Sequence, residues 1–92
     1  MALIRPIPSK DFQYTGYAIN GRTVSYTTTR NGKVYAFSSN PTSSYTSTLT
    51  INNNVVASCD NTGYMDYTGN VSVGDVITLS IGSGAFGSMA II

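Results

Sequence analysis

The last quarter of the chain, residues 71–92, constrains the fold more than any other stretch. Its segment ITLSI, residues 77–81, alternates apolar and hydroxyl side chains, which is the two-residue period of a strand with one buried face. Gly74-Asp75 supplies turn chemistry before this strand, and a glycine-rich break at residues 82–87 follows it. The final residues 88–92 are too apolar for a loose tail. The stretch therefore predicts strands that meet at a tight corner and a closing strand after them.

The same alternation recurs along most of the chain and predicts an all-β fold. Further strands are predicted at residues 14–19, 22–29, 33–38, 45–51, 55–59 and 64–68. Strands that recur roughly every 8–12 residues with turn residues between them are typical of an antiparallel β-sandwich or barrel. We therefore predict such a fold with about seven to nine short strands and no helix.

Two turns are predicted to set the order in which the strands pair. Asn20-Gly21 is a strong type I′ signal, so residues 14–19 and 22–29 are predicted to form an antiparallel hairpin. The next strand, at residues 33–38, is predicted to continue the meander. Asn52–Asn54 can adopt the left-handed backbone conformation and is predicted to make a second hairpin turn.

The alternation also predicts which side chains form the core. The side chains on the apolar face of each strand should be among the most buried, and they are Val24, Leu49, Ile51, Val73, Ile77, Leu79 and Ile81. Val34 and Ala36 share one face of their strand. Tyr35 and Phe37 are predicted to lie on the opposite face.

A single domain, residues 10–92, is predicted to follow an extended arm at residues 1–9. Pro6 and Pro8 forbid a helix through the arm. A chain of 92 residues buries only a little over ~60% of the surface that its unfolded form exposes, so the core must be thin. The arm carries three apolar side chains that need burial, so we predict that it lies across its own sheet or a neighbour's; the alternative is a frayed terminus. We predict subunit contacts at Leu3, Ile4 and Ile7.

Charge is scarce, which limits the classes of partner. Charged residues make up 10% of the chain, against about 25% in a typical domain. The five basic residues are scattered, whereas binding to phosphates needs clustered Lys or Arg, so nucleic acid is not predicted as a partner. No apolar run approaches the ~18 residues of a membrane span, so membrane insertion is not predicted either.

The residue types needed for catalysis are mostly missing. The chain has no histidine, the commonest general base and metal ligand, so we predict neither an enzyme nor a cofactor. Cys59, the only cysteine, is predicted to be a buried strand residue rather than a nucleophile. Asp60 and Asp66 offer oxygen atoms to calcium in principle, but turn and strand positions explain them better. The Gly82–Gly87 segment lacks the Lys-Ser/Thr of a phosphate loop and is better explained by close backbone packing.

Seven tyrosines and no tryptophan are the most suggestive feature for binding. Tyrosine combines a flat apolar ring with a hydroxyl group, and together with Ser, Asn and Thr it builds adaptable recognition surfaces. Tyrosine is also simply a good strand former. With that alternative open, we predict contacts to a ligand or host surface at Tyr45, Tyr64 and Tyr67.

One resemblance rests on the second half of the chain. The hairpin sequence TLTINNNVVAS, residues 48–58, followed by YTGNVSVGDVITLSIGSG, residues 67–84, resembles the small β-sandwich modules of bacteriophage fibre tips and heads. It resembles more loosely the trimeric jelly rolls of tumour-necrosis-factor and complement type. The likeness covers residues 48–92 and depends mainly on Val71–Ile77. It implies a jelly-roll-like fold and packing of three copies about an axis.

These observations lead to one functional hypothesis and one rival. The first is a non-enzymatic phage structural or fibre-associated module, located in the virion, that self-associates as a homotrimer. It would decorate the particle by contact with other virion proteins, or contact a glycan on the host surface. The rival is an extracellular carbohydrate-binding module or small lectin, in which tyrosines stack on sugar rings.

Overall fold

The computed structural model describes residues 11–39, 45–60 and 63–92, and these residues form eight strands without a helix. The predicted all-β fold is confirmed. The strands are β1 (Phe12–Ala18), β2 (Arg22–Thr27), β3 (Gly32–Ser39), β4 (Ser47–Ile51), β5 (Asn54–Cys59), β6 (Tyr64–Val71), β7 (Val76–Ile81) and β8 (Ala85–Ile91). The predicted arm and its subunit contacts at Leu3, Ile4 and Ile7 lie outside the described residues.

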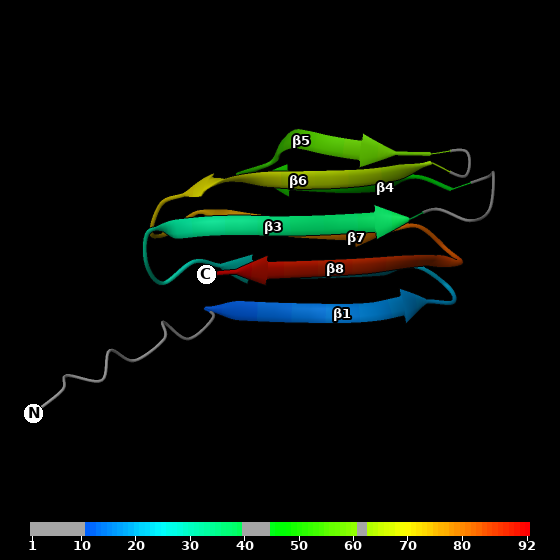
Figure 1. Cartoon of the computed structure of the whole chain (residues 1–92), viewed down its shortest axis with the longest axis horizontal. Coiled ribbons are helices and arrows are strands. Elements are labelled where there is room, and N and C mark those ends of the chain that lie inside the picture. Colours follow the sequence, from blue (N-terminus) through cyan, green and yellow to red (C-terminus); the bar gives the residue numbers. More distant parts are fainter. Residues whose placement is uncertain (1–10, 40–44, 61–62) are drawn as a thin grey trace, which may run out of the picture.

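The strands form two antiparallel sheets of four strands each. Sheet A has the order β1-β8-β3-β6 and sheet B the order β2-β7-β4-β5. Figure 1 shows the strands of sheet A side by side in front of sheet B. Consecutive strands change sheet at every connection except β4 to β5, which is the strand order of an eight-stranded jelly roll. The predicted β-sandwich is therefore confirmed.

The prediction of a hairpin at Asn20-Gly21 is wrong. The turn is present, and Gly21 has a positive φ of 80°, but β1 pairs with β8 and β2 pairs with β7. The predicted meander into β3 fails for the same reason, since β3 pairs with β6 and β8. Each of these strands has one apolar face, and in a sandwich such faces can meet across the core instead of lying side by side. Phe12 and Tyr26 show this, because their rings stack 4.7 Å apart between the two sheets.

The second predicted hairpin is confirmed. Asn52 and Asn53 both have positive φ angles, 52° and 67°, and they connect β4 to β5 with Ile51 opposite Asn54. Two central residues with positive φ define the type I′ turn that suits paired strands. Asparagine tolerates this conformation better than most residues, which is why the short Asn run identifies the turn.

A hydrogen-bonded cluster of Thr28, Asn52, Ser72 and Asp75, which we name the polar clasp, fastens one end of the sandwich. The Asp75 carboxylate accepts the Ser72 N–H at 2.8 Å and the Asn52 side-chain amide at 3.0 Å. Thr28 is buried, and its hydroxyl donates to the Ser72 carbonyl at 2.6 Å. The hydrogen bonds from Ser72 and then Asn52 lower the pKa of Asp75. The clasp ties the segments before β7 and after β2 to the β4–β5 turn.

The core lies between the sheets and receives side chains from both. Of the seven predicted core residues, Leu49, Ile77, Leu79 and Ile81 are at most 2% exposed, and Val24 and Ile51 are half-buried. Val73 is 61% exposed, so that prediction is wrong. Its alternation with Val71 does not continue the strand, because β6 ends at Val71 and Val73 sits in the following turn. Sheet A contributes further buried side chains that were not in the predicted set: Ala18, Val34, Ala36, Met65, Val71, Ala85, Met89 and Ile91.

Candidate functional site: the outer face of sheet A

The side chains of sheet A that point away from the core form three rows across its four strands. The strand register gives the rows Tyr17–Phe86–Ser39–Tyr64, Thr15–Ser88–Phe37–Asp66 and Gln13–Ala90–Tyr35–Thr68. Strand alternation places them outside, because their neighbours along each strand face the core. We name the surface made by these three rows the aromatic face. Its five aromatic residues are Tyr17, Tyr35, Phe37, Tyr64 and Phe86.

Three of the rings form a continuous ridge over three strands. The Phe37 ring lies 6.3 Å from the Tyr64 ring and 6.5 Å from the Phe86 ring, measured between centroids. These separations lie within the range in which aromatic pairs attract one another. Much of the ridge still contacts solvent, since Tyr64 is 72% and Phe86 38% exposed. Tyr17, opposite Phe86 on the edge strand, extends the apolar surface further and is 61% exposed.

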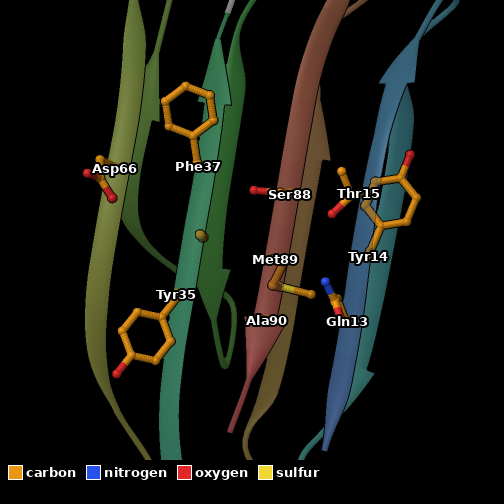
Figure 2. Close-up of a pocket in the computed structure, with 10 residues that line it drawn as sticks. Gln13, Tyr14, Thr15, Tyr35, Phe37, Asp66, Ser88, Met89 and Ala90 are labelled. Atoms are coloured by element: carbon orange, nitrogen blue, oxygen red, sulfur yellow. The ribbon is translucent and has the colours of Figure 1, made fainter. Parts of the chain in front are cut away.

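A shallow hollow of about 190 Å³ lies beside the ridge. Its floor is formed by Ser88 and Ala90 on β8, whose small side chains leave space between the taller neighbours. Figure 2 shows Tyr35 and Phe37 along β3 on one side of this floor and Gln13 and Thr15 along β1 on the other. Asp66 on β6 contributes a carboxylate beyond Phe37. The hollow thus combines aromatic walls with a few hydrogen-bonding groups.

The aromatic face carries almost no charge. Along the described strands of sheet A, only Lys33 and Asp66 are charged and point outward. The central strand β8 has no charged residue at all. Asp11 precedes β1, and its carboxylate accepts hydrogen bonds from the Thr29 hydroxyl and the Thr29 N–H, which lower its pKa. Such a surface is suited to burial against a partner rather than to attracting a charged ligand.

The outer face of sheet B has a different chemistry. Apart from the pair Thr27–Val76, in which Val76 is 39% exposed, its outward side chains form the rows Thr23–Ser80–Thr48–Ser58 and Ser25–Thr78–Thr50–Val55. We name this surface the hydroxyl face. Seven of its eight residues are Ser or Thr, and the hydroxyl groups of Ser25 and Thr78 hydrogen-bond at 3.1 Å. No aromatic or charged side chain lies in these two rows, so this face is suited to contact with water.

The structure places the three tyrosines predicted for ligand contact in different settings. Tyr64 lies on the aromatic face. Tyr67 is on the same strand but points to the opposite side of sheet A, where it packs against the core. Its ring covers Gly69, where an added Cβ would lie 2.6 Å from the tyrosine hydroxyl oxygen. Tyr45 is 50% exposed and precedes β4, outside both sheets. The three side chains therefore do not share one face, and their contact with a ligand remains a prediction.

Other aromatic residues of this face did not enter the predicted site. Tyr17, Tyr35, Phe37 and Phe86 stand on three different strands, and only the strand order brings them together. The available signal was the alternation that separates Tyr35 and Phe37 from the buried residues of β3. The sequence could not provide their neighbours, because β8 pairs with β1 and β3 across large sequence separations.

The acidic residues and the cysteine are the side chains of this molecule that could in principle hold a metal ion. In the described ranges 11–39, 45–60 and 63–92, no three His, Cys, Asp or Glu side chains come close enough to hold a metal ion. Asp66 lies on the aromatic face and Asp60 follows β5. Cys59 is buried as predicted, and burial raises the pKa of its thiol. The described residues include no helix that is long and apolar enough to cross a membrane.

Comparison with known proteins finds no relative. No protein-family model matches the chain, and neither the curated proteins nor the solved structures give a significant match. The strand order and the chemistry of the two outer faces therefore carry the functional inference.

Proposed function

We propose that this chain is a non-enzymatic structural module of a bacteriophage particle, which self-associates and decorates the virion or contacts the host surface. The observation that carries the proposal is the exposed aromatic face beside an almost uncharged hollow. Monomeric soluble proteins rarely leave large contiguous apolar patches in water, and such patches mark interaction sites. The jelly-roll strand order adds support, because capsid and lectin domains use this architecture.

The proposed assembly is a closed ring of identical subunits, with a trimer as the expected form. Closed symmetry uses every copy of the interacting surface and so leaves none exposed. It also suits a fibre or a particle surface, where several weak contacts to the host add through multivalency. Fold alone does not establish this role, because one fold supports many functions.

Sedimentation equilibrium of the purified chain at micromolar concentration tests the self-association. The expected mass is three times that of the 9.8 kDa chain. A monomer at every concentration would contradict the proposal. The virion location has a separate test, mass spectrometry of purified particles from the phage that encodes the chain. Absence of its peptides there would contradict the location and leave the assembly result intact.

A small carbohydrate-binding module is the second candidate, and the hollow favours it. The rings of Tyr35 and Phe37 can stack on the apolar face of a sugar, while Asp66 and Ser88 offer hydrogen-bonding groups to its hydroxyls. Titration of the chain with a panel of neutral monosaccharides and oligosaccharides, followed by NMR shifts, tests this reading. Saturable binding by a monomer, lost in Tyr35→Ala, would favour the carbohydrate-binding module over the virion module.

A further inference from the structure

We propose that the aromatic face of sheet A is the surface on which a second copy of this chain packs. This inference rests on the proposed self-association and names the surface that performs it. The occupant is another copy of the chain, and the contact is centred on Phe37, Phe86 and Ser88. The predicted contacts of the arm at residues 1–9 are not needed for it.

The composition of the face is that of an interface core. In protein interfaces the buried centre is depleted in charge and enriched in aromatic residues, and tyrosine is frequent among the residues that dominate affinity. Here five of the twelve side chains in the three rows are aromatic and only Asp66 is charged. Lys33 adds the opposite sign farther along β3. Together with Asp66, Lys33 leaves the outward side of sheet A without net charge.

The size of the face fits the same role. Four strands about 4.8 Å apart and five residues about 3.3 Å apart, with their side chains, give a footprint of roughly 500 Å². A standard interface takes about 800 Å² from each partner, including a polar rim around an apolar centre. The aromatic face therefore supplies the centre of such an interface and its surroundings supply the rim.

The aromatic face has a raised part and a recessed part that can fit together between copies of the chain. The ridge of Tyr64, Phe37 and Phe86 stands beside the hollow over Ser88 and Ala90. A ring from the ridge of one copy can enter the hollow of the next, where it meets the rings of Tyr35 and Phe37 on one side and small residues on the floor. The face thus presents its ridge to one neighbour and its hollow to the other, which is the head-to-tail contact that a closed ring of copies requires.

The extent of the exposed apolar surface distinguishes a second copy from a sugar. The hollow is lined by Tyr14, which belongs to the inner side of β1, and by two of the five rings of the aromatic face, Tyr35 and Phe37. A sugar in the hollow would therefore leave the other three rings of the face uncovered. Tyr17, Tyr64 and Phe86 would remain 38–72% exposed. Neighbouring copies, one at the ridge and one at the hollow, together cover all five rings. The observed extent of the face therefore favours a protein surface of matching shape.

A matched pair of serines gives the decisive variants. Ser88 and Ser80 both lie half-buried on a central strand and both point outward, Ser88 on the aromatic face and Ser80 on the hydroxyl face. Ser88→Arg places an unpaired charge in the centre of the proposed contact, whereas Ser80→Arg places the same charge in water. Burying an unpaired charge in an interface is strongly unfavourable. We expect Ser88→Arg to raise the dissociation constant of the assembly at least about 100-fold and Ser80→Arg to leave it unchanged.

A second pair protects the test against misfolding of the first variant. Tyr17 on edge strand β1 is 61% exposed, and Val55 on edge strand β5 of the other sheet is 63% exposed. Both positions accept arginine without disturbing the core. Tyr17→Arg should weaken the assembly by about tenfold or more, and Val55→Arg should not. Circular dichroism and thermal unfolding of each variant confirm that the fold is retained.

Sedimentation equilibrium of the full chain and the four variants separates the outcomes. Assembly of the wild type that is lost only in the two sheet A variants supports the inference. Assembly that persists in folded Ser88→Arg and Tyr17→Arg overturns it, although self-association itself would stand. A monomeric wild type overturns both the inference and the proposed self-association. If that monomer binds a neutral sugar and Ser88→Arg does not, the hollow is a carbohydrate site instead.

Discussion

The two sheets of this molecule share one core but present unlike surfaces to the outside. Sheet A exposes a ridge of aromatic rings beside a hollow, whereas sheet B exposes two rows made almost entirely of Ser and Thr. Both sheets have four antiparallel strands and the same in–out alternation. The difference therefore does not follow from the architecture. It lies in the residue types that the outward positions of each sheet carry.

Threonine allows the hydroxyl face both to form strands and to remain hydrated. Its branched side chain is a good strand former, and its hydroxyl group remains hydrated or bonds a neighbour, as Thr78 does with Ser25. Tyrosine and phenylalanine are equally good strand formers, but their rings leave a large apolar area in water. Strand propensity therefore does not distinguish hydroxyl residues from aromatic residues at these outward positions. The aromatic residues on sheet A need a separate cause. We propose that this cause is the second copy of the chain that covers the rings.

The largest loss of stability should follow truncation of side chains on the inner faces of the two sheets, where both sheets contribute equally to the core. Leu79 of sheet B and Met89 of sheet A are both at most 1% exposed on central strands. Truncation of either to alanine should lower the free energy of unfolding by about 2–5 kcal/mol, because it removes buried contacts and leaves a cavity. Urea denaturation of the monomer measures this loss. A loss below about 0.5 kcal/mol at either position would show that the two sheets do not share the core equally.

The matched control for these two changes is Ser80→Ala. Ser80 follows Leu79 in β7 but points outward, so its truncation should change stability by less than about 0.5 kcal/mol. A larger loss at Ser80 than at Leu79 would mean that the alternation assigned to β7 is inverted.

A smaller loss of stability is expected at Gly87, where the two sheets pack closely. A Cβ added at Gly87 of β8 would lie 2.5 Å from Cδ1 of Ile81, which belongs to β7 of the other sheet. Gly87→Ala should therefore cost about 1–3 kcal/mol, the usual penalty for overfilling a packed core. Adding Ile81→Val removes the methyl group that is hit and should recover part of the loss. A neutral Gly87→Ala would show that the sheets have room to separate there.

Much of the fold can be predicted from the sequence, because alternation is local. The strands of residues 45–51 and 76–81 and the buried Leu49, Leu79 and Ile81 follow from period-two patterns. The Asn52–Asn53 turn follows from the backbone preference of asparagine. The failure at Asn20-Gly21 has a physical reason: a turn residue determines where the chain reverses but not which strand becomes its partner. Val73 fails because alternation can run past the end of a strand into a turn.

The candidate site is less predictable than the fold. Tyr64 could be chosen from the number of tyrosines, but Tyr67 differs from it only in strand parity and points inward. The same parity distinguishes Tyr14, which covers Gly16 on β1 just as Tyr67 covers Gly69 on β6. Both belong to a Tyr-Thr-Gly sequence on an edge strand of sheet A. Neighbours such as Tyr17, Phe86 and Phe37 come together only through long-range pairing, which local patterns do not contain.

The smallest expected effect is a decrease in stability at low pH, and it should arise from the polar clasp. Hydrogen bonds from Ser72 and Asn52 lower the pKa of Asp75 in the folded chain. A carboxylate with a lowered folded pKa adds stability above its unfolded pKa of about 3.9 and loses it as the pH falls further. Asp75→Asn should therefore be less stable than the wild type at pH 6, and the difference should shrink below about pH 4. Urea midpoints at several pH values measure it.

Asp60→Asn is the control for this acid effect, because it removes an exposed carboxylate outside the clasp. Its stability difference from the wild type should be smaller at pH 6. An equal pH dependence in both variants would mean that the clasp is not the source of the acid sensitivity. Either result leaves the assignment of the two outer faces unchanged, since the clasp lies at the end of the sandwich.

The central claim, that a second copy covers the aromatic face and water covers the hydroxyl face, has one direct test. Tyrosine nitration, mapped by mass spectrometry, can be measured at concentrations below and above that of assembly. Tyr17, Tyr35 and Tyr64 are 42–72% exposed on the aromatic face, and Tyr45, 50% exposed outside both sheets, is the internal reference. The account predicts that assembly protects the three tyrosines of sheet A and leaves Tyr45 reactive. An assembled chain in which these three tyrosines remain as reactive as in the monomer would contradict it.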